Sequence, residues 1–259
     1  SIAAPRRTAP DGVTYKSVLK TTGESYTNRT IDLRNNQLME ATIEPATDEE
    51  IQNTIKVMGG EDWILWIKAL KEAGVLADGA KTVAYSYIGP ELTYPIYKEG
   101  SIGQAKKDLY ASADKIQAEI DGVEAYVSVN KAVVTQSSAA IPIVPLYLAI
   151  LFKVMKEQKV QEGCIEQMYR MIHDRLCNGG AVVTDENRLI RMDDWEMEPK
   201  VQEAVAEIWQ KIDQDNLEEV TDLEGYWQEF YEIFGFRIDG VDYGADVDAD
   251  VQIPSIAAE

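Results

Sequence analysis

The sequence predicts an α/β fold in which a parallel β-sheet is flanked by helices. Segments 81–89 and 125–134 are rich in β-branched and aromatic residues, which is typical of buried strands. Segments 101–120 and 143–157 predict helices and alternate with those strands, an order that indicates parallel βαβ units. With 259 residues and a hydrophobic content of 45%, the chain can bury a core, and we expect a single domain over residues 1–259.

The first part of the chain, residues 1–45, is rich in Thr, Gly, Asn and Pro, which predicts loops and short irregular strands. A helix is expected to begin directly after Thr47. Thr47 and Glu50 have the spacing of a capping box, and acidic residues favour the positive end of a helix. The glycine pair at 59–60 interrupts this helix, and a second helical run ends at Gly74.

The later part of the chain predicts further helices. The apolar run "AAIPIVPLYLAILF" at 139–152 is shorter than the roughly 18 to 20 residues of a membrane span and contains two prolines. It therefore predicts a buried helix and no membrane insertion. Residues 164–177 and 193–212 predict amphipathic helices, and the tail from 239 is acidic and irregular.

The charge balance argues against one class of partner. The chain has 25 Lys and Arg against 45 Asp and Glu, a formal net charge of -20, so we expect no nucleic-acid partner. Cys164 and Cys177 suggest no disulfide framework, which fits a reducing cytoplasm. No metal site is expected, because His173 lacks a second ligand at metal spacing. The "DVDAD" at 246–250 also lacks the glycine and final glutamate of a calcium loop.

The stretch "YKEGSIGQAK" contains the main candidate site. Residues nine apart on one helix lie about half a turn out of phase, so Tyr97 and Lys106 converge only if Tyr97 precedes the helix. Gly100 supplies that break, and Ser101 with Gln104 has the spacing of a capping box. If the two side chains meet, the ammonium lowers the pKa of the phenol and makes it a better proton donor. The alternative is a half-buried loop tyrosine followed by a solvated lysine.

The surrounding sequence resembles one family. The segments on which this resemblance rests are "KVMGGEDW", "TVAYSYIGP", "YKEGSIGQAKKDL", "SVNKAVVTQSSAAIPIVPLY", "EGCIEQMYR", "DDWE" and "GVDY". In this order they resemble the monomeric trans-2-enoyl-CoA and enoyl-acyl-carrier-protein reductases, a branch of the short-chain dehydrogenase superfamily. The resemblance covers nearly the whole chain and includes a tyrosine followed after eight residues by a lysine. It implies a Rossmann-type sheet and a monomer.

The resemblance also implies roles for individual residues. Tyr97 resembles the active-site tyrosine, Lys106 the lysine that holds the nicotinamide ribose, and Tyr87 a second tyrosine that contacts the substrate. The helix at 143–155 resembles the part of the fold that covers the acyl chain. The residues expected to border the cofactor, besides Lys106, are Val133, Val134, Thr135, Ser1 and Ile2.

The implied activity is reduction of the trans-2 double bond of an enoyl-CoA or enoyl-acyl-carrier-protein thioester by NADH, in fatty-acid synthesis. Hydride addition at the β-carbon places negative charge on the thioester oxygen, so a donor must already be aimed at that oxygen. Tyr97 would be this donor, with Lys106 maintaining its electrostatics and the cofactor pose. Arg6 and Arg7 suit either a phosphate of CoA, an acidic carrier protein or a structural ion pair.

One feature of the family is not found in the sequence. Nucleotide sites of this kind begin with a glycine-rich turn between a strand and a helix, and no segment here has that context. The chain therefore looks like roughly the C-terminal two thirds of a longer family member, without the first strands of its sheet. Two alternatives stay open. One is a truncated fragment that retains the acyl-thioester surface but has no cofactor and no activity, and the other is a carbonyl reductase whose tyrosine protonates an alkoxide.

Overall fold

A three-stranded parallel sheet organises the larger part of the structure, a computed structural model that describes residues 5–248 and 250. Its strand order is β5 (Ala80–Ser86), β6 (Val123–Val129) and β7 (Leu189–Arg191). Both neighbouring pairs are parallel, with Ala80 opposite Val123 and Val127 opposite Leu189. The predicted parallel pairing of the first two strands is therefore confirmed, and β7 is a further strand that the sequence did not predict.

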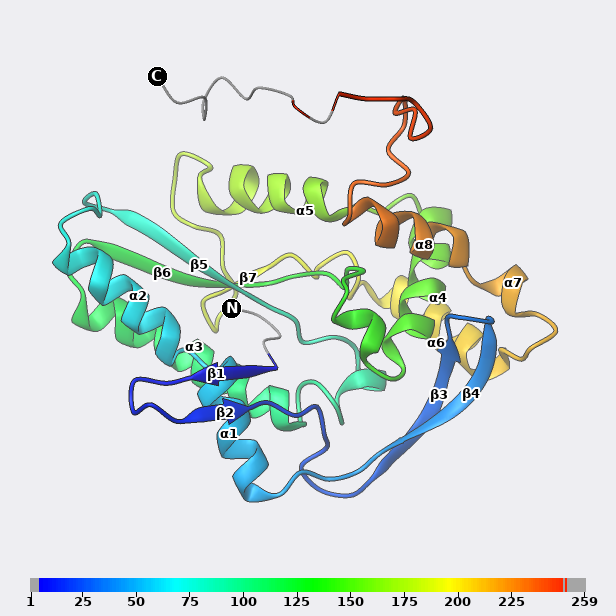
Figure 1. The fold of residues 1–259 in the computed structure, drawn as a ribbon, viewed down its shortest axis with the longest axis horizontal. Coiled ribbons are helices and arrows are strands. Elements are labelled where there is room, and N and C mark those ends of the chain that lie inside the picture. Colours follow the sequence, from blue (N-terminus) through cyan, green and yellow to red (C-terminus); the bar gives the residue numbers. More distant parts are fainter. Residues whose placement is uncertain (1–4, 249, 251–259) are drawn as a thin grey trace.

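Helices lie on both faces of this sheet (Figure 1). One face packs against α2 (Glu61–Glu72) and α3 (Ser101–Glu119) through side chains that include Ile67, Ile116 and Val127. The other face packs against the π-helical η3 (Met171–Leu176), which continues α5 (Cys164–Arg170). The amphipathic helix predicted over 164–177 is thus present, and its second half is π-helical. The α/β architecture with a helix-flanked parallel sheet is confirmed.

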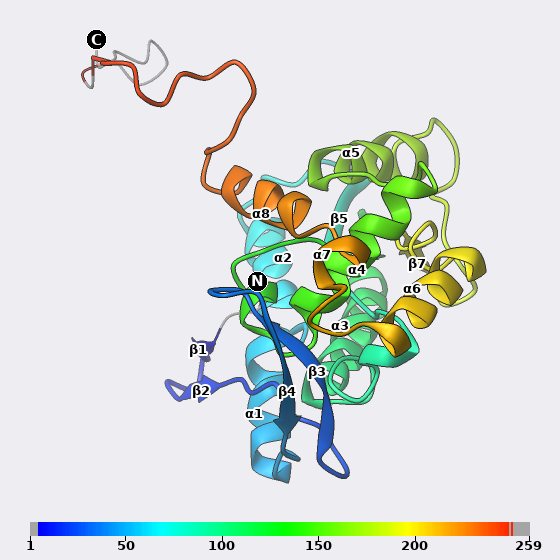
Figure 2. The same cartoon turned by 90° about the vertical axis from the view of Figure 1, so that its right-hand side faces the viewer.

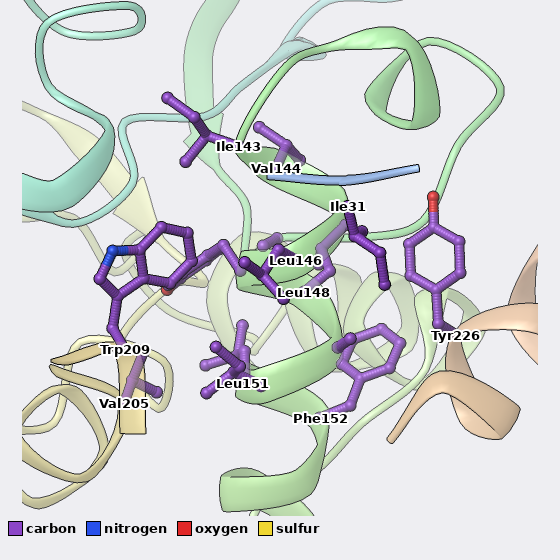
Figure 3. Packing of buried hydrophobic residues seen from close by; sticks show 14 of the residues in the cluster. Ile31, Ile143, Val144, Leu146, Leu148, Leu151, Phe152, Val205, Trp209 and Tyr226 are labelled. Carbon is purple, nitrogen blue, oxygen red and sulfur yellow. The ribbon is translucent and has the colours of Figure 1, made fainter. Parts of the chain in front are cut away.

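The second core surrounds α4 (Val144–Glu157), the predicted buried helix. A helix that is apolar on all sides needs neighbours on all sides. These neighbours are the β3 hairpin strand (Tyr26–Asp32), α6 (Pro199–Lys211) and α8 (Leu223–Glu232), and Figure 2 shows them gathered beside α4. In Figure 3, Leu148 and Phe152 of α4 lie among Ile31, Trp209 and Tyr226, which come from those three elements.

The N-terminal part forms two hairpins. The short antiparallel pair β1 (Arg6–Thr8) and β2 (Thr14–Lys16) fits the predicted irregular strands, whereas the seven-residue pairing of β3 with β4 (Gln37–Ile43) is more regular than predicted. The remaining short elements are η1 (Glu91–Thr93), η2 (Ser138–Ala140) and α7 (Leu217–Val220). Within the described residues, no helix is both long and apolar enough to cross a membrane.

Two predicted helix caps have different outcomes. At α1 (Asp48–Met58) the capping box is confirmed, since Glu50 N donates to Thr47 Oγ1 at 3.2 Å and Thr47 N donates to Glu50 Oε2 at 2.9 Å. At α3 the box is wrong, because Gly100 is the N-cap and no side chain caps the helix. The Ser101 hydroxyl instead donates to the backbone carbonyl of Val18 at 2.6 Å, which fastens the start of α3 to the N-terminal segment.

Candidate active site

The candidate residues lie after the carboxyl ends of the three parallel strands. Tyr87 and Tyr97 follow β5, residues 132–135 follow β6, and Glu196 follows β7. Segments that leave neighbouring parallel strands at the same end meet at one edge of the sheet, where α/β folds bind their ligands. The fold therefore brings together side chains that are far apart in the sequence.

The two tyrosines form one wall of the site. Their ring centroids are 5.0 Å apart and the rings are nearly perpendicular, at 88°. Tyr97 is buried, and Tyr87 is half-buried. The glycine of "YSYIGP" lets the chain turn here, because Gly89 has a φ of +76°. It also leaves room for the tyrosine, since a Cβ on Gly89 would lie 2.9 Å from the Tyr87 hydroxyl oxygen. A larger residue at position 89 would disturb this wall.

The break between Tyr97 and the following helix is present as predicted. Tyr97 precedes α3, and its backbone N–H donates to the carbonyl of Thr93 at 2.9 Å. Gly103 in the first turn of α3 lies directly against this segment, since a Cβ on Gly103 would overlap the carbonyl oxygens of Tyr97 and Lys98. The glycines of "YKEGSIG" thus let the helix and the tyrosine segment approach closely.

Lys106 is a buried lysine in the second turn of α3. Its exposed fraction is 9%, and it lines a cavity of about 410 Å³ between α2, α3 and β5. Burial lowers the pKa of its ammonium to about 8. Across residues 5–248 and 250, its ammonium has no hydrogen-bond or ion-pair partner. Because buried polar groups are normally paired, this ammonium is available to a polar ligand.

Tyr97 and Lys106 do not form the predicted pair. Within the described part of the chain no hydrogen bond joins them, and Lys106 faces the cavity beside α2 while Tyr97 packs into the α4 core. The pKa of the Tyr97 phenol is raised, first by burial and then by the charge of Glu196. The prediction that Lys106 lowers this pKa is therefore wrong, because burial disfavours the phenolate and the charge of Glu196 adds to that effect.

The other predicted site residues come from the segment after β6. Val134 is buried, while Val133 and Thr135 are half-buried. Thr135 is held in place by a reciprocal pair of bonds, in which its N–H donates to Ser138 Oγ at 2.8 Å and the Ser138 N–H donates to Thr135 Oγ1 at 2.9 Å. The predicted cofactor contacts Ser1 and Ile2 lie outside the described residues.

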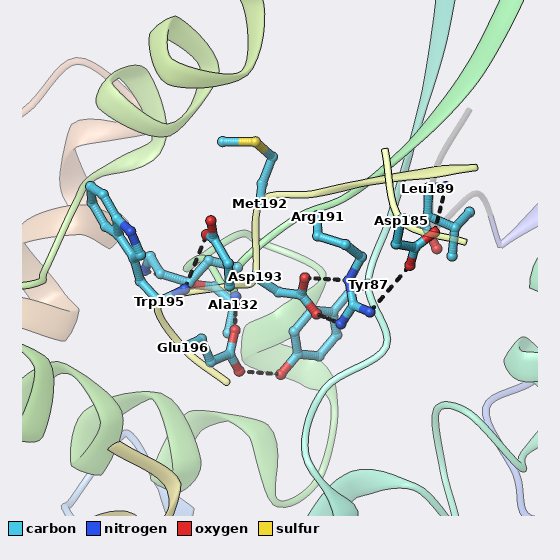
Figure 4. A network of polar contacts seen from close by, with 12 residues as sticks. Tyr87, Ala132, Asp185, Leu189, Arg191, Met192, Asp193, Trp195 and Glu196 are labelled. Atoms are coloured by element: carbon cyan, nitrogen blue, oxygen red, sulfur yellow. Dashed lines mark hydrogen bonds and ion pairs between the residues drawn. The ribbon is translucent and has the colours of Figure 1, made fainter. Parts of the chain in front are cut away.

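Sequence reasoning missed the polar centre of the site, Glu196 (Figure 4). This carboxylate is fully buried and accepts hydrogen bonds from the hydroxyls of Tyr87 at 3.0 Å and Tyr147 at 2.6 Å, and from the N–H of Ala132 at 2.7 Å. Burial raises the pKa of Glu196. Tyr147 could have been suspected, because a phenol in an otherwise apolar buried helix needs a partner. Glu196 is the last residue of the segment "DDWE", which is part of the family resemblance, but neither its charge nor its spacing sets it apart among 45 acidic residues.

The two N-terminal arginines have different surroundings. Arg7 forms ion pairs with Glu61 at 2.6 Å and Asp62 at 3.3 Å and also donates to the backbone carbonyl of Lys56. The structural alternative is therefore confirmed for Arg7, whose guanidinium fastens β1 to the start of α2. Arg6 is exposed.

Comparison with known proteins identifies related sequences over nearly the whole chain. A family model described as the trans-2-enoyl-CoA reductase catalytic region matches residues 1–177, and one described as the enoyl reductase FAD binding domain matches residues 184–247. The trans-2-enoyl-CoA reductase [NADH] of Ruminiclostridium cellulolyticum is 52% identical over 99% of this chain and 65% of its own length. The enoyl-[acyl-carrier-protein] reductase [NADH] of Psychromonas ingrahamii is 52% identical over 99% of this chain and 66% of its own length.

A solved structure agrees with these matches. The trans-2-enoyl-CoA reductase of Treponema denticola, in complex with NAD, superimposes with a TM-score of 0.90 at 49% identity, covering 95% of this chain and 62% of that one. The chain thus spans slightly less than two thirds of the length of these relatives. Since the match to the catalytic-region model covers well over half of the sequence, the chain belongs to the trans-2-enoyl-CoA reductase family.

Proposed function

We propose that this chain reduces the trans-2 double bond of an enoyl-CoA or enoyl-acyl-carrier-protein thioester with NADH. The observation that carries the proposal is the buried Tyr97, whose hydroxyl has no hydrogen-bond partner among residues 5–248 and 250 and lies at the carboxyl edge of the sheet. A hydroxyl donor without a partner is free to bond a ligand. The names of the relatives, which specify enoyl thioesters and NADH, support this substrate and this cofactor.

The residues present fit a nicotinamide dinucleotide. The ammonium of Lys106, which is buried and has no partner among the described residues, suits the hydroxyls of a ribose, and the segment 133–135 emerges from β6 at the same edge of the sheet. NADH, when bound, supplies the hydride that adds to the β-carbon of the substrate. Lys106 would hold the ribose, and Val133, Val134 and Thr135 would line the nicotinamide.

Tyr97 would stabilise the negative charge that develops on the thioester oxygen. Burial and the nearby Glu196 raise the pKa of its phenol, so the hydroxyl keeps its proton at neutral pH and acts as a hydrogen-bond donor. A donor that is fixed by packing before the reaction requires little reorganisation during it. Tyr97 is packed against Tyr87 on one side and belongs to the core around α4.

The described residues do not fit a flavin dinucleotide in the segment matched by the second family model. A dinucleotide site needs a glycine turn between a parallel strand and a helix. Between β7 and α6 the chain has no glycine, and the glycines from 184 to 247 are Gly225, Gly235, Gly240 and Gly244. Gly225 lies inside α8, and the others follow that helix. We therefore assign no step to FAD.

Further parts of the proposal concern the whole protein. The sheet flanked by helices supports a place in the short-chain dehydrogenase superfamily, and the partial coverage of the relatives supports correspondence to their C-terminal part. Free Cys164 and Cys177 support a cytoplasmic location. One domain over 1–259 is supported by the α4 core, which takes residues from Ile31 to Tyr226, and we propose that the protein acts as a monomer.

Parallel assays with crotonyl-CoA and a simple ketone test this function. The proposal expects NADH oxidation that depends on crotonyl-CoA, with the ketone giving at most about 1% of that rate, since the site is built for a thioester oxygen. A faster reaction with the ketone would establish a carbonyl reductase instead. A folded chain that binds crotonyl-CoA and oxidises no NADH would establish the second candidate, an acyl-thioester-binding fragment without cofactor. The lack of a glycine turn in the sequence favours that candidate.

A further inference from the structure

One buried carboxylate connects three segments of the site. Glu196 follows β7, its partner Tyr87 follows β5, Ala132 follows β6, and Tyr147 belongs to α4. Its exposed fraction is 0%, so these contacts are not shared with solvent. Figure 4 shows the carboxylate between Ala132 and the hydroxyl of Tyr87. Movement of Glu196 would therefore displace both the tyrosine wall and the segment that begins at Ala132.

The donors and acceptors around Glu196 can be assigned from their chemistry. The N–H of Ala132 can only donate, so Oε2 accepts. Gln202 Nε2 donates to the Tyr147 oxygen at 3.2 Å, which leaves the Tyr147 proton for Oε1 of Glu196. The Tyr147 hydroxyl and the Ala132 N–H, both directed at one carboxylate, favour its charged form and oppose the effect of burial. A charged carboxylate can only accept, so the third bonded group, the Tyr87 hydroxyl, donates.

It follows that Tyr87 directs its only proton at Glu196. The Tyr87 oxygen can then offer a ligand only a lone pair, so it accepts from an N–H or O–H group. A thioester carbonyl has no such proton, whereas the amide N–H groups of a pantetheine arm do. The neighbouring Tyr97 has no such bond within the described residues, so its proton remains available. The two tyrosines are therefore chemically different although their rings touch.

We infer that Glu196 is a positioning residue of this site, which fixes the Tyr87 hydroxyl as a hydrogen-bond acceptor beside Tyr97 and holds the start of the 132–135 segment. For its effect on turnover, the inference rests on the proposed function. Glu196 itself would touch neither the substrate nor the cofactor. Its influence would pass through Tyr87 on one side and through the backbone at Ala132 on the other.

A kinetic double-mutant cycle tests the route through Tyr87. In the wild-type background, Glu196→Gln is expected to lower kcat for crotonyl-CoA by about tenfold. The reason is that the NH2 group of the new amide donates, whereas the carboxylate oxygen that it replaces accepted a hydrogen bond. In a Tyr87→Phe background the same change is expected to lower kcat by less than about twofold, since the hydroxyl to be positioned is gone and the amide oxygen at position 196 still accepts from the N–H of Ala132. Equal losses in both backgrounds would overturn the inference.

The matched control is Glu229→Gln in α8. Glu229 is also a largely buried carboxylate whose pKa is raised by burial, but its side chain bonds Gln161, interacts with the charge of Lys131, and forms no hydrogen bond with Tyr87 or Ala132 among the described residues. Its removal is expected to change kcat by less than about twofold. A tenfold loss in this control would mean that any buried charge matters equally, which contradicts a specific role for Glu196.

Two further measurements keep the inference testable if activity or folding fails. Glu196→Asp keeps the charge on a shorter side chain, and its kcat is expected to lie between those of the wild type and Glu196→Gln; a kcat below that of Glu196→Gln would oppose the inference. Without any catalysis, the losses in Tm caused by Glu196→Gln and Tyr87→Phe are expected to be non-additive in the double variant. Additive losses would overturn the inference, whereas a wild type without turnover but with coupled losses would refute only the proposed function.

Discussion

Burial shifts the pKa values of two residues of the candidate site in opposite directions. For Tyr97 the charged form is the phenolate, so burial raises the pKa, and Glu196 adds to the effect. For Lys106 the charged form is the ammonium, so burial lowers the pKa, to about 8. Both shifts follow from the same cost of holding a charge away from water. At neutral pH the phenol remains a donor, and the ammonium remains mostly charged but is costly to bury.

Replacement of Tyr97 tests its role as the donor. Tyr97→Phe keeps the ring against Tyr87 and removes only the hydroxyl. We expect kcat with crotonyl-CoA to fall by about 100- to 1,000-fold, the usual cost of removing one donor to a developing oxyanion. NADH affinity, measured by calorimetry on the same preparation, should change by less than about threefold. Near-wild-type turnover in the variant would rule out Tyr97 as the donor.

The pKa of Lys106 predicts a pH dependence of stability. In the unfolded chain the Lys106 ammonium has its ordinary pKa of 10.5, whereas in the folded chain it loses its proton near pH 8. Between these values the unfolded state holds more protons, so unfolding free energy rises with pH. Between pH 8 and 10.5, we expect the unfolding free energy of the wild type to rise by roughly 3 kcal/mol relative to that of Lys106→Met.

Urea unfolding across that pH range measures the difference. Lys107→Met is the matched control, because Lys107 is the next residue on α3 and is exposed. An equal gain in the unfolding free energy of the wild type over Lys107→Met would show that the gain does not come from the burial of Lys106. If the difference in unfolding free energy between the wild type and Lys106→Met does not change with pH, Lys106 is solvated in the free protein.

At the scale of elements, the site depends on how closely α3 approaches the segment before it. Gly103 allows this approach, and the Ser101 hydroxyl fastens the same helix turn to Val18. Local sequence predicted where α3 begins and that Tyr97 precedes it, because Gly100 breaks the chain there. The cap was not predictable, since the partner of Ser101 lies 83 residues away. The β3–β4 hairpin was missed for a related reason, because its strands bury residues such as Ile31 against the distant α4.

Gly103→Ala tests this close approach. An alanine in a helix normally stabilises it, but here the Cβ would overlap the carbonyl oxygens of Tyr97 and Lys98. We expect a loss of about 1 to 3 kcal/mol in unfolding free energy from the backbone shift, together with a lower kcat because Tyr97 moves. Chemical denaturation and the crotonyl-CoA assay measure the two effects. Gly23→Ala is the control, because a Cβ there meets nothing within 4 Å; an equal loss in both variants would contradict the account.

At the scale of the whole molecule, sequence patterns predicted that the candidate residues meet at one edge of the sheet, but not that Glu196 joins them. Tyr87, Tyr97 and Thr135 follow strands that could be predicted, so their meeting at one edge of a parallel sheet could be expected. Glu196 is 109 residues from Tyr87 and 64 from Ala132, and it follows the unpredicted β7. No hydrogen bond joins Tyr97 and Lys106 within the described residues, because rotation about α3 and tertiary packing decide where Lys106 faces.

The central claim is best tested by NADH binding and crotonyl-CoA-dependent NADH oxidation, measured on one sample of the 259-residue chain. The account predicts saturable NADH binding that Lys106→Met weakens, and turnover that Tyr97→Phe lowers by about 100- to 1,000-fold without loss of binding. These residues would then suffice for a working site without a glycine turn of their own. A folded chain that binds no NADH and shows no turnover would contradict the claim that these residues form an enoyl-thioester reductase.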